Sequence, residues 1–272
     1  MDFCLRFSEE IVAGVVSELE VLSRMPSLQS QHAIATKSSI HRVTHLLRNI
    51  PGGELETYGP LGARYDAAVL AVPARICKQP SLPELQSTIA QQPFRKGGLG
   101  YQTWQKTADA AFLASYVHAS IQVPALFPDL GLLFPDVRTL LCPPDGAPVT
   151  APSNASFFAA RAAIRLIAIA PGVLEAAAPV RGQTPRQLQH SISLLVEEAH
   201  HPSVLERLTK IDNPSHPRHQ SAFLSSSGDA HTMGAIPGSQ TTIGNELFTT
   251  IVRLKLLLPI HPYNGEVLQC PR

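Results

Sequence analysis

Apolar residues recur along this chain at the spacing of α-helices. The first run begins after Ser8 and has apolar side chains three or four residues apart, at Ile11, Val15, Leu19 and Leu22. Such spacing places them on one helix face. The sequence contains no sustained alternation of apolar and polar residues, which is the pattern typical of strands. We therefore expect a mainly α fold, an irregular helical array, with further helices over residues 28–49, 61–76, 81–93, 103–120, 155–170, 185–199, 203–211 and 245–258.

Proline and glycine break this helical pattern. The 272 residues include 24 prolines, well above the usual level of about 5%. Helices should therefore be short, and Pro73 should kink or split the helix over residues 61–76. Three glycines also fall within four residues, at Gly97, Gly98 and Gly100. They favour a tight turn or an extended segment approached closely by other backbone, so residues 92–101 are expected to hold at most a small hairpin.

The density of proline divides the chain into three regions. Residues 123–152 are rich in proline and weakly periodic, which predicts a connector with at most one short turn of helix. Residues 1–122 and 153–272 would then form two loosely connected helical units. Within the second unit, residues 212–240 are rich in Ser, Gly, His and Pro and predict a loop. Asn245 follows this loop and should cap the final helix.

Positive charge is concentrated in one early segment. The whole chain carries a net charge of only +1. From Arg24 to Lys106, however, ten Lys or Arg residues face four acidic ones, a local net of +6. Such a segment can present a surface to phosphates, or it can be an ordinary solvated helix face. Charge alone leaves both interpretations open.

The common motifs of enzymes and metal sites are missing from the sequence. His41 and His45 share a helix face, but no Glu follows His41 as a HExxH zinc site requires. The glycines after Lys96 have neither Walker nor dinucleotide-binding spacing, and no G-x-S-x-G nucleophile elbow occurs. The four cysteines form no CxxC pair. We expect no catalytic residue, no metal site and no cofactor.

The sequence shows neither a leader peptide nor an apolar stretch of about 20 residues. We therefore expect an intracellular protein, in the nucleus or cytoplasm, that contacts no membrane.

Several segments in order nevertheless resemble one family. The helix after Ser8-Glu9-Glu10, the run RVTHLLRNIP at residues 42–51 and the run YDAAVL at residues 65–70 are similar to the region after the palm of non-LTR retrotransposon reverse transcriptases. The most specific segment is PFRKGGLG at residues 93–100, which resembles the P-x-R-x-GGLG element that begins the thumb. An alanine-rich run at residues 107–115 follows, as in that family. Near the end, residues 246–259 look like the helix before a Cys/His knuckle, and Cys270 stands where such a knuckle would begin.

This resemblance implies a fragment without polymerase activity. The family's palm holds catalytic metal ions on an aspartate pair, and no FADD or YADD run occurs here. The matching palm and fingers would lie before Met1, and the palm or endonuclease portions of the same element would be partners. The thumb helices would grip an RNA or DNA duplex through its phosphates, weakly and without sequence preference. The side chains expected to contact phosphates are Lys37, Arg42, Arg48, Arg95, Lys96 and Lys106.

A second interpretation needs no nucleic acid. The chain could be an unrelated helical scaffold that buries apolar helix faces against a partner protein. Gly97, Gly98 and Gly100 would then only shape a turn, and the basic side chains around them would be solvated surface residues.

Overall fold

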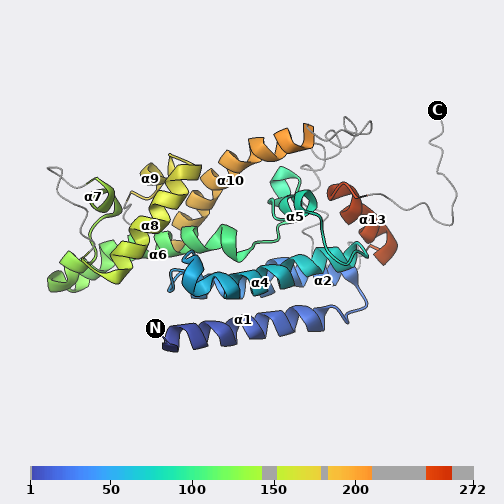
Figure 1. Ribbon diagram of the computed structural model, residues 1–272, viewed down its shortest axis with the longest axis horizontal. Helices are drawn as coiled ribbons and strands as arrows, with labels where there is room; N and C mark the ends of the chain where they lie inside the picture. The colour runs from blue at the N-terminus through green and yellow to red at the C-terminus, as the bar shows by residue number, and fades with distance from the viewer. Residues whose placement is uncertain (1, 143–151, 179–182, 210–242, 259–272) are drawn as a thin grey trace.

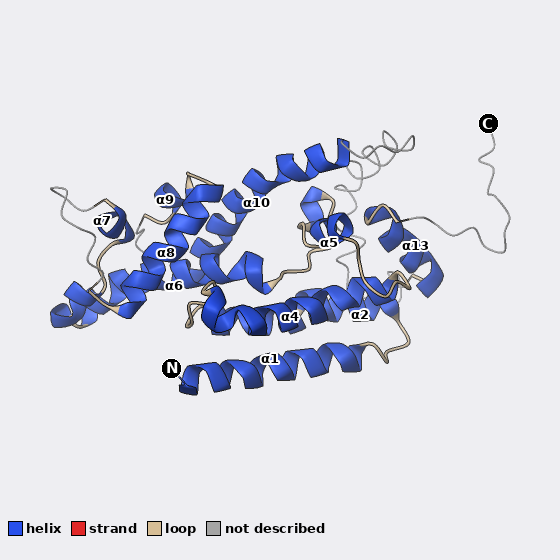
Figure 2. Cartoon of the chain, viewed as in Figure 1, coloured by secondary structure: helices blue, strands red, loops and turns tan. Residues whose placement is uncertain are grey.

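Helices form every regular element that the structure describes. The structure is a computed structural model, and it describes residues 2–142, 152–178, 183–209 and 243–258. Figure 2 shows no strand in these ranges, which confirms the mainly α fold. The helices are α1 (Asp2–Leu22), α2 (Leu28–Lys37), α3 (Arg42–Leu47), α4 (Leu55–Ile76), α5 (Glu84–Ala90), α6 (Trp104–Leu126), α7 (Val137–Leu141), α8 (Asn154–Ile169), α9 (Val173–Ala176), α10 (Pro185–Thr209) and α13 (Asn245–Lys255). Short 3-10 helices lie between some of them, η1 (Ser39–His41), η2 (Phe94–Lys96) and η3 (Pro128–Leu133).

Helix α6 joins two groups of buried apolar side chains. In Figure 1, α1 and α4 lie side by side, and they pack with α2, α3 and α13 around the first core. The second core lies between α6, α8 and α10. The start of α6 contributes Trp104 to the first core, and its middle contributes Leu113 to the second. Each fully buried aliphatic or aromatic side chain contributes about 1.5–3 kcal/mol through the hydrophobic effect.

Trp104 fixes the start of α6 against α4. Its indole Nε1 donates to the carbonyl oxygen of Gly52 at 2.8 Å, and its backbone N donates to Asp66 Oδ1 at 2.5 Å. The ring fits because Gly52 and Gly62 have no side chain. A Cβ on Gly62 would lie 2.7 Å from the indole Cδ1. Burial raises the pKa of Asp66 to about 6, against the two amide hydrogen bonds that lower it. At neutral pH its carboxylate therefore complements the positive end of the α6 dipole.

Residues 92–101 form a turn, called the glycine turn from here on, that folds back on the end of α5. Gly97 and Gly100 have φ angles of 84° and 72°, a conformation that glycine adopts without strain. A side chain on Gly98 would collide with the backbone oxygen of Gln92. Gly100 N donates to that same oxygen at 2.9 Å. The segment thus contains the 3-10 helix η2 and returning backbone amides, with no hairpin.

Proline breaks fewer helices than the sequence suggested. Pro73 was expected to kink or split its helix, but α4 continues through it to Ile76. Val69, Val72 and Ile76 on both sides of Pro73 are fully buried. Their burial outweighs the roughly 3 kcal/mol that an internal proline costs. Pro202 likewise lies inside α10, which replaces the two expected helices over residues 185–199 and 203–211 with one. Conversely, the expected helix over residues 28–49 is divided into α2, η1 and α3.

The proline-rich interval is more helical than expected. Helix α6 reaches Leu126 through Pro124, and η3 and α7 follow it. The expectation of at most one short turn in residues 123–152 was therefore wrong. Val137 and Leu140 of α7 are buried in the second core, which stabilises a helix too short to persist alone. The cores also mix the two expected units, because Val204 and Phe248 belong to the first core and Ala110 to Val117 contribute to the second.

Asn245 stabilises a helix other than its own. The sequence suggested that it caps the last helix, but Gly244 occupies that position and Asn245 is the first residue of α13. The Asn245 side chain instead reaches α2: Oδ1 accepts from Leu28 N at 3.0 Å and Nδ2 donates to Pro26 O at 2.6 Å. These bonds satisfy an amide at the start of α2 that has no partner within its own helix.

A charged cluster ties the start of α4 to α6 and α8. The Arg165 guanidinium donates to both carboxylate oxygens of Asp109, with Nη2–Oδ1 at 2.7 Å and Nε–Oδ2 at 2.8 Å. Its third nitrogen donates to Glu54 Oε1 at 3.0 Å, and Arg161 pairs with Oε2 of Glu54 at 2.9 Å. Hydrogen bonds to Asp109 and Glu54 raise the pKa of Arg165. Two-pronged pairing of this kind fixes geometry as well as charge.

A buried histidine joins α2, the glycine turn and α13. His32 is 1% exposed, and its Nδ1 shares a 2.8 Å hydrogen bond with the Tyr101 hydroxyl. The rings of Phe94 and Phe248 also contact it. Within the described residues, Nε2 has no hydrogen-bond partner. Burial lowers the pKa of His32 to about 3, helped by the charges of Lys37 and Lys255.

Glycine substitutions in α4 test the Trp104 contact. We expect Gly62→Ala to lower the free energy of unfolding by about 1–3 kcal/mol, because the new methyl group would overlap the indole. Gly59→Ala lies on the same helix, where the added Cβ would have only an ordinary contact with Leu55, 3.8 Å away. It should raise the free energy by about 0.5–1 kcal/mol through helix propensity. Urea unfolding measures both, and equal effects would contradict this arrangement.

His32 should make the protein sensitive to acid. Its folded pKa lies below the value of 6.5 for the unfolded chain, so only the unfolded state gains a proton as the pH falls from about 6.5 towards 3. The contribution of His32 to the free energy of unfolding therefore has its full value above pH 6.5, and it should fall by roughly 1.4 kcal/mol for each pH unit below 6.5.

Urea unfolding at pH 7 and pH 5 measures this loss. His32→Gln should remove about 2 kcal/mol of the difference between the two pH values, whereas His190→Gln, at an exposed position of α10, should leave the difference unchanged. An unaltered pH dependence in His32→Gln would refute the assignment.

Candidate nucleic-acid interface

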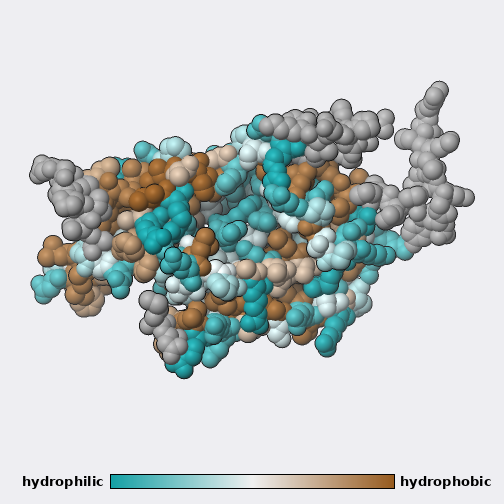
Figure 3. All heavy atoms as spheres, viewed as in Figure 1, coloured by the Kyte–Doolittle hydropathy of each residue, from teal (hydrophilic) through white to brown (hydrophobic). Residues whose placement is uncertain are grey.

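A basic groove lies between η1, α3 and α10. It is a cleft of about 530 Å³, and its lining is dominated by cationic, histidine and amide side chains. Figure 3 shows hydrophilic residues gathered between α10 and α4, while apolar residues gather over α8 and α9. We define the basic groove by Lys37, His41, Thr44, His45, Arg48, Gln102, Arg186, Gln189, His190, Ser193 and Glu197.

Arg48 is positioned at the contact between α3 and α10. Its Nε and Nη2 donate to Oε1 of Gln189 at 3.2 and 2.9 Å. Burial lowers the pKa of Arg48, and the charge of Arg186 lowers it further. Two guanidinium groups thus lie close enough to repel each other. Burial also lowers the pKa of His41, and Arg186 adds to that effect against a hydrogen bond to the backbone of Thr36. An anion placed in the groove would relieve this repulsion.

The six basic residues singled out in the sequence do not share one surface. Lys37 and Arg48 line the basic groove. Arg42 pairs with Glu18 of α1 at 2.5 Å. Arg95 pairs with Glu197 at 2.8 Å. Lys96 is half-buried on the glycine turn next to Arg95, and Lys106 lines a small pocket between α6 and α10 that adjoins the groove.

The pair between Arg95 and Glu197 shapes the charge of the groove. Glu197 is the acidic side chain among the groove residues, and its carboxylate is engaged by a guanidinium from the glycine turn. Lys37, Arg48 and Arg186 then dominate the field inside the cleft. Both partners are partly exposed, so the pair itself contributes little to stability. Its main effect is on the electrostatic potential inside the basic groove.

Sequence reasoning missed the contribution of α10. Arg186, His190, Ser193 and Glu197 follow one another at intervals of four, three and four residues, which places them on one helix face. They line the groove together. This polar stripe is visible in the sequence, but nothing in the sequence indicates that it faces α3. The packing of α10 on α6 decides that.

The described residues show no site for a metal ion and no membrane-spanning helix. No group of three or more His, Cys, Asp or Glu side chains comes together among them. None of the described helices is long and apolar enough to cross a membrane. Cys270, where the resemblance places the start of a knuckle, and the predicted loop at residues 212–240 lie outside the described residues.

Exposed apolar side chains gather at the end of α6 and in η3. Leu126 and Leu132 are 68% and 84% exposed. Others nearby are Phe127, Leu130 and Leu133. Contiguous apolar surface of this kind is typical of contacts with other molecules, and it is the feature that favours the alternative of a helical scaffold.

A comparison of the chain with known protein families, curated proteins and solved structures finds no match.

Proposed function

We propose that this chain contacts the phosphates of a nucleic-acid duplex through the basic groove, without catalysing a reaction itself. The observation that carries the proposal is the meeting of Lys37, Arg48 and Arg186 in one cleft. Cationic side chains on a concave surface attract the phosphate backbone and release its counterions. Such contacts position a duplex and do not read its sequence.

The role proposed is that of a thumb-like fragment of a retrotransposon reverse transcriptase. Support comes from the resemblance of residues 93–100 to the start of such a thumb, and from a helical fold in which the glycine turn presents Arg95. In this proposal Lys37, Arg48 and Arg186 contact phosphates, whereas Arg95 acts through Glu197 and Arg42 is engaged by α1. The palm of the same element would be a partner, and the protein would work inside the cell, in the nucleus or cytoplasm.

The second candidate function is a protein scaffold. It is favoured by the exposed apolar side chains at the end of α6 and in η3. The two candidate functions respond to different substitutions, because removal of the groove cations weakens duplex binding and does not affect binding of a partner protein. Leu126→Ser with Leu132→Ser should leave duplex affinity unchanged if the first proposal holds.

Salt dependence of duplex binding tests the proposal. Three phosphate contacts predict a slope of about −2.7 in the logarithm of affinity against the logarithm of salt concentration. Lys37→Gln with Arg186→Gln removes two exposed groove cations and should bring the slope to about −0.9. Fluorescence anisotropy with an RNA–DNA hybrid measures it, and hybrids of different sequence should behave alike.

A matched variant separates the groove from net charge. Lys78→Gln with Arg138→Gln also removes two exposed cations, both outside the groove. It should keep the slope near −2.7. If this variant weakened binding as much as the groove variant, the groove would not be the contact surface. Absence of binding at low salt by the folded chain would overturn the proposed function.

A further inference from the structure

Three histidine side chains line the basic groove on both of its walls. His41 ends η1 and His45 lies one turn further on, in α3, whereas His190 belongs to α10. All three residues are exposed, so a ligand in the groove can reach them. Histidine is the side chain whose charge changes most readily between pH 5 and 8. The charge of the groove therefore depends on pH in that range.

Fixed cations lie among these histidines. Lys37 at the end of α2, Arg48 of α3 and Arg186 of α10 line the same cleft. Arg186 and His190 are four residues apart, so they share one face of α10. A positive charge nearby disfavours a second positive charge on an imidazole. In the free protein the groove cations therefore oppose protonation of the groove histidines.

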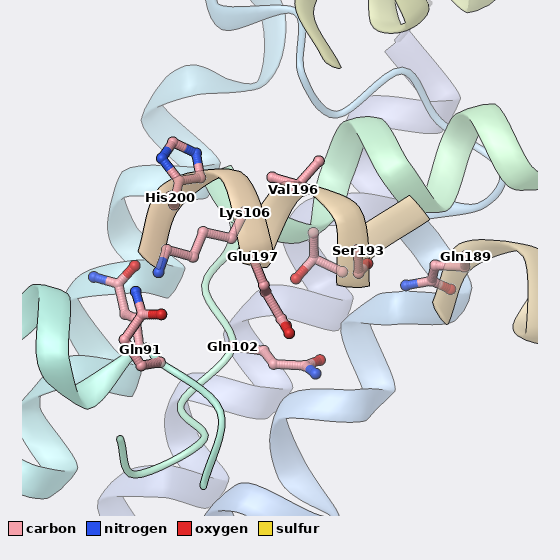
Figure 4. A pocket seen from close by; sticks show the side chains of 10 residues that line it. Gln91, Gln102, Lys106, Gln189, Ser193, Val196, Glu197 and His200 are labelled. Atoms are coloured by element: carbon pink, nitrogen blue, oxygen red, sulfur yellow. The ribbon is translucent and has the colours of Figure 1, made fainter. Parts of the chain in front are cut away.

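The acidic side chains around the groove already have basic partners. Along α10 the groove adjoins the smaller pocket shown in Figure 4, which Glu197 and Lys106 line together. The carboxylate of Glu197 pairs with Arg95. On the other wall, Glu18 of α1 pairs with Arg42, the residue next to His41. These pairs leave a net positive field at the histidines, and an anionic ligand would change it most.

His41 illustrates how a phosphate would act. Partial burial lowers the pKa of His41, a hydrogen bond to the backbone of Thr36 opposes this, and the charge of Arg186 adds to the lowering. A phosphate in the groove has the opposite effect, because its negative charge favours the imidazolium form. The complex then holds more protons than the free protein. Its affinity therefore rises as the pH falls through the range in which histidine titrates.

We propose that the basic groove takes up protons on its histidines when it binds phosphates, so that it holds a duplex more tightly in mild acid. This inference rests on the proposed function and adds its regulation by pH. Lys37, Arg48 and Arg186 supply attraction at every pH, and the histidines add a charge that the ligand itself stabilises. An imidazolium beside a phosphate also releases counterions. The groove then makes about three charged contacts at pH 8 and about four at pH 6.

The pH dependence of duplex affinity in the full chain tests this proposal. Anisotropy with one RNA–DNA hybrid is measured at pH 6.0 and pH 8.0 and equal ionic strength, and circular dichroism checks that the chain is folded at both. A histidine whose pKa rises by one unit in the complex adds up to tenfold in affinity. We expect the affinity at pH 6.0 to exceed that at pH 8.0 on the order of tenfold. The salt slope should steepen from about −2.7 to about −3.6.

Glutamine variants separate the groove from the total charge of the chain. His41→Gln, His45→Gln and His190→Gln together keep a polar side chain at each position and remove its titration. This triple variant should reduce the gain in affinity between pH 8.0 and pH 6.0 to about twofold or less. His118→Gln, in α6 outside the groove, should keep the gain near tenfold. A full gain in the triple variant would overturn the proposal, because it would arise elsewhere in the chain.

Calorimetry measures the proton uptake directly. Titration of the hybrid in two buffers of different ionisation enthalpy should show on the order of one proton taken up per bound hybrid at pH 6.5. A hybrid bound equally at both pH values, without proton uptake, would overturn this inference and leave duplex binding by the fixed cations intact. Absence of binding at both pH values in low salt would overturn the proposed function, and this inference with it.

Discussion

The position of one indole ring determines how the helices of this protein are arranged. Trp104 lies between the backbone of Gly52 and Gly62, and Asp66 of α4 binds the first amide of α6. These contacts set the direction in which α6 leaves the first core. Because α8 and α10 pack on α6, the second core and the wall of the basic groove follow from that direction. A protein that misplaced this ring would lose the groove even with every helix formed.

Polar contacts between distant segments then adjust the surface that α6 and α10 create. Arg48 reaches Gln189 across 141 residues, and Arg95 reaches Glu197 across 102. Both contacts end on α10, so this helix receives side chains from α3 and from the glycine turn. The consequence is an uneven distribution of charge along one helix. The Arg186 end of α10 is cationic, and further along α10 lines a small pocket together with several glutamine side chains.

The sequence predicted well where helices lie along the chain, but it predicted poorly how those helices pack against one another. Periodicity located the helical segments because apolar spacing depends on local geometry. Proline was overestimated as a breaker: Pro73 and Pro202 both lie inside helices. At Pro73 the burial of neighbouring side chains outweighs a lost backbone hydrogen bond. Of the candidate site, Lys37 and Arg48 lie in one cleft, but Arg186 was missed. Its role depends on the packing of a helix about 140 residues further along the chain, which no local pattern encodes.

The contact made by Asn245 has a consequence for biosynthesis. A ribosome releases the chain from its N-terminus, so α1, α2 and α4 emerge long before α13. Until residue 245 is free, Leu28 N lacks the acceptor that it has in the finished protein, and Phe248 is not yet present to cover His32. Closing a loop of 217 residues adds an entropic cost that grows only slowly with length. Until α13 has been synthesised, the first helices therefore stay in an incomplete state, and the part of the first core that Phe248 covers in the folded protein is exposed to water.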